Sequence, residues 1–479
     1  AEDGIRDCLL SRGLGDVYKR QRLIFKGILF YLTFLSFSLF SNSYEASASG
    51  MSHERLQKIA PTLNDLYLKN GKFPGFVSAV ARKGKVVHYE TLGFADVETG
   101  ESLKRDSLFR IYSMSKPITG VALMVLLEEG KVRLNDPVSL YIPEFGKTKV
   151  LVINDDGSSE LVDQKKEMTI RDLATHTSGL AYDFTANKQL AKIYRENNLS
   201  PYFSISNITK ESLASGMITA EKPYDDICDF AETLATKAPL MHQPTENYTY
   251  SVGMDVLGCV IERASGIRFD QFLNQKIFKP LNMKDTFFTV PESKKDRFTS
   301  LYAEIKDLRR FFPELDESLP KDLTMLRVDT KQMSPYYKQA TVFDGGSGLV
   351  SSTEDYLKFA QMLLNGGKLG EQRIISRKSV ELMSGNHLPD SFSSDAYLET
   401  AGGYRRGAGI GLTVGVLTDP AKAGQYGSKG MFFWGGAAST IFWIDPEEEL
   451  VAVLMTQVLG SSERLRETYS ALVYQAIDD

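Results

Sequence analysis

The chain has 479 residues, of which 42% are hydrophobic and 24% are charged, and its formal net charge is -5 at pH 7. This composition is typical of a globular protein with one large or two medium domains. The mild acidity and the lack of a basic stripe exclude a nucleic-acid footprint. No CxxC or clustered His, Cys or Asp pattern suggests a metal site, so no metal is expected.

The N-terminal stretch does not look like part of a folded domain. Residues 1–21 have no clear apolar period and resemble a translated, non-native tail. Residues 22–48 form a predicted secretory signal peptide: a basic head leads into the apolar run 27–40 and the small-residue site Ala46-Ser47-Ala48. An uncleaved membrane anchor is the alternative. The mature domain, 49–479, is therefore expected in the periplasm or outside the cell, with no membrane contact beyond the signal peptide.

The first third of the mature chain alternates between helix and strand patterns. Helical periodicity covers residues 54–70, and two β-rich runs follow at 76–82 and 85–94. The dipeptide Lys83-Gly84 between these runs predicts a hairpin. An apolar helix is predicted at 118–127.

The remaining sequence changes character twice. From about 141 to 339, short amphipathic helices such as 170–174 and 254–264 lie among polar loops, and the irregular stretches 201–237 and 292–339 are predicted to be surface loops over the cleft or decorative insertions. After a helix at 353–365, the pattern predicts strands at 409–416, 431–433, 438–444 and 450–456. A last helix is predicted at 463–477. The chain is thus predicted to be α+β: one antiparallel sheet completed by both ends (about 51–140 and 340–479), with an inserted helical domain.

The three cysteines are too few for a disulfide framework. Cys8 lies in the discarded tail, which leaves Cys228 and Cys259. They could pair in an oxidising compartment, but we expect two separate thiols, with Cys259 packed in a helix.

The strongest chemical pattern is the pair Ser113 and Lys116, just before the apolar helix. In a helical segment this spacing puts both side chains on one face. Ser113 would lie in the first turn, where free backbone N–H groups favour a developing oxyanion. A desolvated lysine amine can remove a serine proton. Taken alone, Ser113 is equally consistent with an ordinary helix-start serine.

Two further elements indicate catalysis only in combination with the pair Ser113 and Lys116. Tyr250 precedes the helix 254–264 and could carry a proton if a nearby ammonium lowered its pKa, although a lone tyrosine is more often structural. Trp434, Gly435 and Gly436 lie in a predicted strand. Paired glycines there indicate close backbone approach, either to a ligand or at a bulge in the sheet.

Together, the order and spacing of these elements resemble the serine β-lactamase and penicillin-binding-protein superfamily. Within it, the chain is most similar to class C β-lactamases and above all to the family VIII carboxylesterases. The resemblance covers about residues 74–459, and the stretches 109–119, 170–180 and 345–352 support it. It implies a β-lactamase/transpeptidase-like fold, in which an antiparallel sheet flanked by helices is joined by an all-helical domain and the site lies between the two.

The resemblance also implies roles for individual residues. Ser113 would attack the substrate carbonyl, while Lys116 and Tyr250 would share its proton and Lys116 would keep Tyr250 partly ionised. The backbone N–H groups of Ser113 and Ala437 would form the oxyanion hole. No metal or organic cofactor is implied. Either Lys116 or Tyr250 could be the base.

Departures from the class C pattern narrow the expected substrate. Val252 stands where those enzymes have an asparagine, and Trp434-Gly435-Gly436 replaces Lys-Thr-Gly, as in the family VIII esterases. With an amide and a cation gone, these four residues are expected to line an apolar pocket for small-molecule esters with short acyl chains. The alternatives are a D-alanyl-D-alanine peptidase or weak β-lactamase, and a non-catalytic relative.

A triad-type serine hydrolase is a poor alternative. The chain contains no G-x-S-x-G pentapeptide, so an α/β-hydrolase nucleophile elbow is not available. His176 is the plausible candidate for a triad histidine. In the resemblance, His176-Thr177-Ser178-Gly179 is instead a structural turn.

Overall fold

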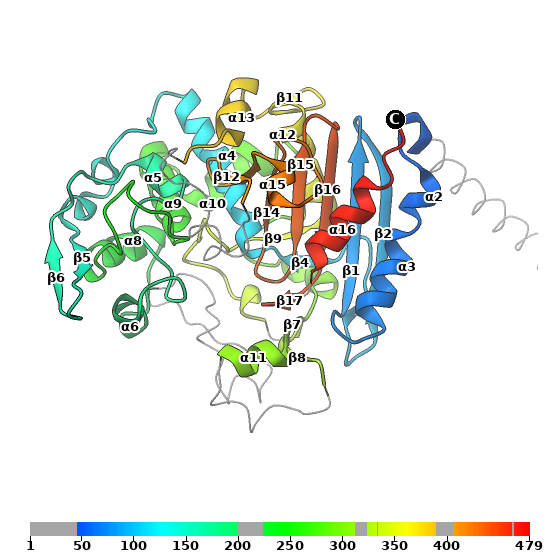
Figure 1. Ribbon diagram of the computed structural model, residues 1–479, viewed down its shortest axis with the longest axis horizontal. Coiled ribbons are helices and arrows are strands. Elements are labelled where there is room, and N and C mark those ends of the chain that lie inside the picture. The colour runs from blue at the N-terminus through cyan, green and yellow to red at the C-terminus, as the bar shows by residue number, and fades with distance from the viewer. Residues whose placement is uncertain (1–45, 200–223, 312–322, 333, 389–405, 462–463) are drawn as a thin grey trace, which may run out of the picture.

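The computed structural model describes residues 46–199, 224–311, 323–332, 334–388, 406–461 and 464–479 (Figure 1). The predicted tail and nearly all of the predicted signal peptide lie outside these residues. Packing begins at Ala46, whose side chain is buried. In the described part of the chain, we find no helix long and apolar enough to cross a membrane.

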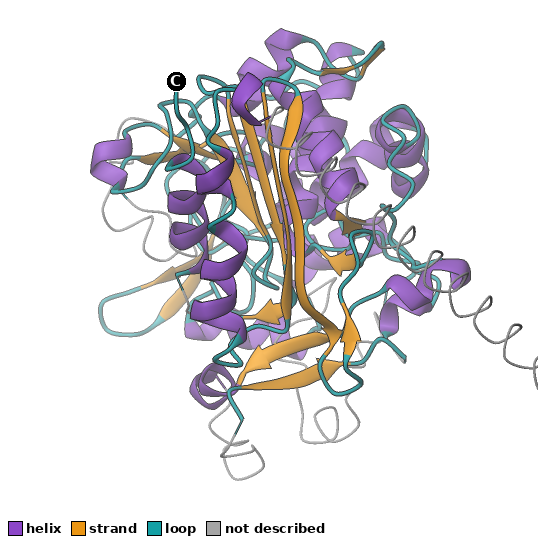
Figure 2. Ribbon diagram, turned by 90° about the vertical axis from the view of Figure 1, so that its right-hand side faces the viewer, coloured by secondary structure: helices purple, strands orange, loops and turns teal. Residues whose placement is uncertain are grey.

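An eight-stranded antiparallel sheet forms the centre of the molecule, with helices on both sides (Figures 1 and 2). Its strand order is β12-β13-β14-β15-β16-β1-β2-β3, so strands from the two ends of the chain meet at β16 and β1. The predicted sheet completed by both ends is therefore confirmed. In chain order the strands are β1 (Gly75–Arg82), β2 (Lys85–Asp96), β3 (Glu101–Ser102), β12 (Ala408–Ile410), β13 (Gly415–Leu417), β14 (Phe432–Gly435), β15 (Ile441–Asp445) and β16 (Leu450–Met455).

The two central strands are hydrophobic because they are covered on both faces. Every residue of β1 and of β16 is buried, and Val77 pairs with Met455 in their register. The predicted hairpin between β1 and β2 is present. Lys83 and Gly84 both have positive φ, 49° and 75°, as a tight two-residue turn requires.

Helices cover the sheet on two faces. On one face, α16 (Leu465–Tyr474) is anchored by Tyr469, whose hydroxyl donates to the carbonyl oxygens of Ala79 and Val453. Beside α16 lie α2 (His53–Leu56), α3 (Ile59–Leu63) and the π-helical turn 64–68. The single helix predicted at 54–70 is interrupted because Pro61 has no N–H to continue the ladder of α2.

The other face carries the elements that lead to the candidate site. There α12 (Thr353–Leu364) packs on the sheet, and the hydroxyl of Tyr356 donates to the carbonyl of Met114. The helix α4 (Ser115–Glu128) follows Met114 and packs against α9 (Gly253–Ser265). The sheet part and the helical part thus meet along α4.

The helical part contains more β-structure than its sequence predicts. Among its described residues, the helices are α5 (Ile170–Ala174), α6 (Lys188–Glu196), α8 (Ile227–Lys237), α9, α10 (Phe269–Leu273) and α11 (Ile305–Phe311). The hairpin β5–β6 (Val150–Ile153, Ser159–Val162) and the strands β7 (Leu301–Glu304) and β8 (Met325–Asp329) were missed. β7 pairs with β8 on one edge and with β17 (Val458–Leu459), near the C-terminal end, on the other, so a local pattern can show only one of its two partners. The stretches predicted as irregular loops therefore contain α8, β7, α11 and β8, while 200–223 and 312–322 lie outside the described residues.

A disulfide joins the helices α8 and α9. Cys228 and Cys259 are bonded, with their Cα atoms 4.9 Å apart. The expectation of two separate thiols is wrong. The two helices pack side by side, and this long-range contact, rather than any local pattern, brings the thiols together.

Candidate active site

Ser113 lies in a short turn between a strand and a helix. The chain leaves β4 (Leu108–Arg110), makes the 3-10 turn Tyr112–Met114 and then enters α4. Lys116 is one turn further on, and its Nζ donates a hydrogen bond to Ser113 Oγ over 3.2 Å. Ser113 is therefore just ahead of the α-helix, and the spacing of three residues still brings the two side chains together.

A buried ionic cluster fixes the strand that precedes this turn. The Arg110 side chain is 0% exposed and its guanidinium donates to the Asp329 carboxylate, while its backbone N–H donates to Gln457. Tyr112, between this cluster and Ser113, has φ of +41°. This conformation is costly for a bulky residue and persists only where the surroundings enforce it. The backbone at Ser113 is thus held from the N-terminal side.

Lys116 is buried and each of its ammonium protons has an acceptor. Besides Ser113 Oγ, Nζ donates to Tyr182 Oη at 3.1 Å and to the carbonyl oxygen of Gly346 at 2.9 Å. Burial lowers the pKa of Lys116 to about 8, although the nearby carboxylates of Asp255 and Asp344 act in the opposite direction. A substantial fraction of the amine is therefore neutral at mildly alkaline pH.

Tyr250 contacts Ser113 from the helical part. Its hydroxyl donates to Ser113 Oγ over 2.7 Å. Burial raises the pKa of Tyr250, and hydrogen bonds with Ser113 and Trp434 offset this only in part. Lys116 Nζ lies over the Tyr250 ring, 4.8 Å from its centroid. The raised pKa of Tyr250 disagrees with the expectation that Lys116 keeps the phenol partly ionised.

Two contributors to this site are absent from the sequence prediction. Tyr182 is buried and accepts a hydrogen bond from Lys116; it follows the 170–180 stretch by two residues, which is the available signal. Asp255, on α9, accepts from the backbone N–H of Gly346 at 2.8 Å and so fixes the carbonyl that binds Lys116. Nothing in local periodicity distinguishes Asp255 from an ordinary first-turn carboxylate.

His176 has a structural position. Its φ is +59° and its ring is buried, 4.7 Å from the centroid of Tyr250. Nδ1 accepts from the backbone N–H of Ser251 at 3.2 Å, and burial holds the pKa of His176 well below its ordinary value. A neutral imidazole that supports the Tyr250 segment agrees with the structural turn expected here.

The two glycines after Trp434 lie so close to other parts of the protein that a side chain at either position would collide with them. A Cβ atom on Gly436 would overlap the carbonyl oxygen of Ile111, the residue before the 3-10 turn. A Cβ atom on Gly435 would meet the guanidinium of Arg466 at 2.5 Å. In the structure, these close approaches are to the backbone beside the nucleophile and to α16. Trp434 is buried and hydrogen bonds Tyr250, with the two ring centroids 6.1 Å apart.

The other predicted residues divide into two groups. Val252 is 0% exposed and packs in the core at the start of α9, so the structure does not bring it to the surface of the site. Ala437 is exposed. Within the described ranges, the backbone N–H groups of Ser113 and Ala437 donate to no protein acceptor, which leaves both available as oxyanion donors.

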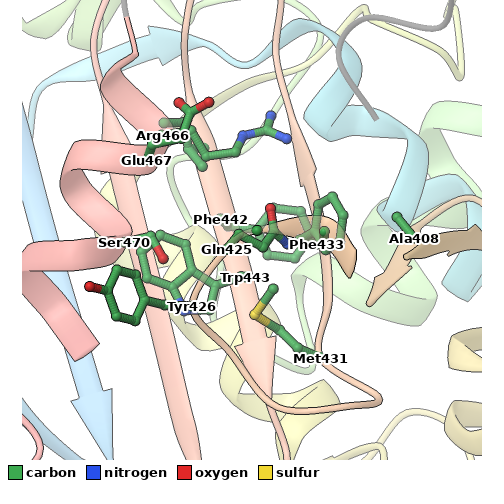
Figure 3. Close-up of a pocket in the computed structure, with 13 residues that line it drawn as sticks. Ala408, Gln425, Tyr426, Met431, Phe433, Phe442, Trp443, Arg466, Glu467 and Ser470 are labelled. Carbon is green, nitrogen blue, oxygen red and sulfur yellow. The ribbon is translucent and has the colours of Figure 1, made fainter. Parts of the chain in front are cut away.

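A separate cavity lies on the α16 side of the sheet. Its volume is about 120 Å³, and Figure 3 shows its walls, which include Phe433, Trp443 and Tyr426, with Arg466 and Glu467 on α16. Successive side chains of a strand point to opposite faces, so Phe433 and Trp434 face away from each other. The cavity is thus across the sheet from the Ser113 site and none of its lining residues takes part there. In the described part of the chain, no group of three or more His, Cys, Asp or Glu residues could hold a metal ion.

Comparisons with known proteins agree with this architecture. The family model described as "Beta-lactamase" matches residues 58–475. Protein Rv1367c of Mycobacterium tuberculosis is 31% identical over 81% of this chain and 86% of its own length. Esterase EstB of Burkholderia gladioli is 28% identical over 82% of this chain and 88% of its own. Among solved structures, EstCE1, "a hydrolase with promiscuous acyltransferase activity", superposes with a TM-score of 0.67 at 24% identity, over 88% of this chain and 99% of its own. The chain belongs to the beta-lactamase family and is a serine hydrolase of the β-lactamase fold.

Proposed function

We propose that this protein hydrolyses neutral carboxylic esters with short acyl chains through an acyl-enzyme on Ser113. The observation that carries the proposal is the environment of Ser113 Oγ, which is contacted at once by Lys116 Nζ at 3.2 Å and by Tyr250 Oη at 2.7 Å. One neighbour is a buried amine that can lose its proton, and the other is a protonated phenol. A base and an acid therefore flank one nucleophile.

Acylation begins with neutral Lys116. When Nζ has lost one proton, its remaining two N–H groups bind Tyr182 Oη and the Gly346 carbonyl, so the lone pair faces Ser113. Lys116 takes the hydroxyl proton as Ser113 Oγ bonds to the ester carbonyl carbon. The carbonyl oxygen becomes an oxyanion between the N–H groups of Ser113 and Ala437.

Collapse of this intermediate breaks the bond to the alcohol. Tyr250 donates its proton to the departing alkoxide, and the proton held by Lys116 restores the phenol. Water then attacks the acyl-enzyme, giving one proton to Lys116 as its oxygen bonds to the carbonyl carbon. The bond between Ser113 Oγ and the carbonyl carbon then breaks, Oγ takes back a proton from the pair Lys116 and Tyr250, and the carboxylic acid is released.

The neighbourhood of Trp434 favours a neutral ester over an anionic lactam. The Trp434 indole occupies the position of the class C lysine and hydrogen bonds Tyr250, so it contributes no cation. Arg466 is close to this strand, but it meets the α16 side of Gly435, across the sheet from Ser113. The 28% identical EstB is named as an esterase, which also supports the proposal.

We place the protein in the periplasm or outside the cell. The leader-like pattern at 22–48 supports this location, and so does the Cys228–Cys259 disulfide, because such bonds persist in oxidising compartments. Detection of the mature protein in a periplasmic fraction of its native host checks the placement, and recovery from the cytoplasm alone contradicts it.

The deciding experiment compares p-nitrophenyl butyrate and nitrocefin as substrates for wild type and Ser113→Ala. We expect fast ester cleavage, slow or no lactam opening, and loss of both in Ser113→Ala with an unchanged melting temperature. A preference for nitrocefin supports the β-lactamase or D-alanyl-D-alanine peptidase alternative. If neither is turned over and an active-site acylating probe adds no mass to Ser113, the protein is a non-catalytic relative.

A further inference from the structure

Four aromatic rings form a ladder that runs from the catalytic centre to solvent. Trp434 lies 6.1 Å from Tyr250, Tyr250 lies 5.2 Å from Tyr182, and Tyr182 lies 5.1 Å from Phe184, measured between ring centroids. Trp434 and Tyr182 are buried, whereas Phe184 is 64% exposed. The ladder therefore ends in a large apolar side chain at the protein surface.

The last two rings are tied directly to the catalytic lysine. Lys116 Nζ lies 5.5 Å from the Tyr182 centroid and donates to its hydroxyl. Phe184 stacks on the same Tyr182 ring, with only 8° between the two planes. Phe184 is thus one ring removed from Lys116, and the contacts from Ser113 to Lys116, Lys116 to Tyr182 and Tyr182 to Phe184 connect it with the nucleophile.

An exposed phenyl ring in this place has a chemical preference. Large apolar side chains gain stability when a ligand covers them, and stacked rings prefer a further planar ring at similar spacing. Aromatic faces carry partial negative charge, so they disfavour anionic groups. The exposed flat face of the Phe184 ring therefore suits a neutral aromatic group better than a flexible alkyl chain.

We propose that the exposed ring of Phe184, supported from behind by Tyr182, forms a subsite for an aryl or arylalkyl group of the substrate, so that esters with an aromatic acyl or alcohol part are preferred. The inference rests on the proposed esterase function and specifies its substrate class. Phe184 acts by binding and takes no part in proton transfer.

The test uses three esters in a pH-stat assay. Ethyl acetate has no aromatic part, ethyl phenylacetate has one on the acyl side, and benzyl acetate has one on the alcohol side. For Phe184→Ala we expect kcat/KM to fall about tenfold for one or both aromatic esters, while ethyl acetate changes less than twofold. The affected ester shows which side the subsite binds. Phe184→Tyr, which keeps the ring, should restore the wild-type preference.

A matched control comes from the opposite side of the sheet. Tyr426 is 58% exposed and stacks on Tyr474 with 16° between the planes, beside the cavity in Figure 3. Tyr426→Ala removes a comparable exposed ring and should leave all three esters unchanged. An equal loss in Tyr426→Ala and Phe184→Ala overturns the subsite, because it shows a general effect on the fold.

The remaining outcomes separate the two proposals. If wild type cleaves the esters and Phe184→Ala changes none of them, or all three equally, the subsite is overturned and the esterase function stands. If wild type cleaves p-nitrophenyl butyrate but none of the three, the subsite is overturned and the esterase function stands. If it cleaves none of the four, the esterase function itself is contradicted and the subsite fails with it.

Discussion

The hydroxyl of Tyr250 donates to Ser113 Oγ over 2.7 Å, although the two residues are 137 positions apart in the chain. Ser113 comes from the turn ahead of α4, and Tyr250 comes from the segment ahead of α9. Packing of α4 against α9 therefore sets the distance between nucleophile and phenol. The chemistry proposed for this site depends on that helix pair as much as on the residues themselves.

Tyr250→Phe removes the phenolic proton and keeps the ring. We expect kcat for p-nitrophenyl butyrate to fall by about 10²–10⁴, because general acid–base catalysis contributes on this scale. The melting temperature should change little, since the ring contacts with Tyr182 and Trp434 remain. A change in kcat under threefold would show that Tyr250 is structural.

The buried amine of Lys116 predicts a specific pH profile. Its pKa is lowered to about 8, and the neutral form is the one that accepts the serine proton. Below pH 8, kcat/KM for a neutral ester should therefore rise about tenfold per pH unit, and it should level off above pH 8. The raised pKa of Tyr250 predicts no loss of its proton near pH 9.

Lys116→Arg provides the control for this profile. Arginine stays charged throughout the range and cannot act as the base, so activity should fall at least about 10²-fold at every pH. A wild-type profile that is flat from pH 6 to 9, or a variant that keeps the wild-type profile, contradicts the assignment of Lys116 as the base.

Alanine substitutions at the neighbouring positions Gly435 and Gly436 should differ in their effects on stability and on kcat. Gly436→Ala places a methyl group against the rigid carbonyl of Ile111 and should displace the turn that carries Ser113, costing about 1–3 kcal/mol in stability and at least tenfold in kcat. Gly435→Ala meets the movable end of Arg466, so we expect a smaller effect on both. Thermal unfolding and ester kinetics of the two variants check this order; equal effects would show that the Ile111 contact does not position the nucleophile.

Removal of the disulfide should affect stability rather than chemistry. Cys228 and Cys259 enclose a loop with a sequence separation of 31, for which loop entropy predicts a stabilisation of about 3–4 kcal/mol. Urea unfolding of the Cys228→Ser, Cys259→Ser double variant should show a loss of this order. At 25 °C, kcat should stay within a few-fold of wild type. An unchanged midpoint would mean that the two helices are held by packing alone.

Local sequence patterns predicted those parts of the fold whose partners are near in the chain or whose hydrophobic period is strong. The β1–β2 hairpin, α5 and α12 are examples, and the spacing of Ser113 and Lys116 was sufficient to bring their side chains together. By contrast, β7 was missed: β8 is near it in the chain, but β17, which pairs with its other edge, lies far along the chain.

The errors at the site have the same origin. Tyr182 reaches Lys116 only because the helical part packs on α4, and no spacing rule connects them. The protonation of Tyr250 depends on how completely its neighbours enclose it, which a motif does not encode. Val252 was assigned to the pocket by its position in a motif, yet the start of α9 turns its side chain into the core.

The hydrogen bond from Tyr469 to the carbonyl of Ala79 joins residues 390 positions apart, and β1 pairs directly with β16. During synthesis, one of the two edges of β1 therefore stays uncovered until β16, residues 450–455, has been made. Until then an apolar strand edge is open to other chains. A nascent chain that ends before β16 is accordingly exposed to aggregation, and one that ends before β14 also lacks the Trp434 wall of the site. The activity proposed for this site would thus report only chains that extend past β16.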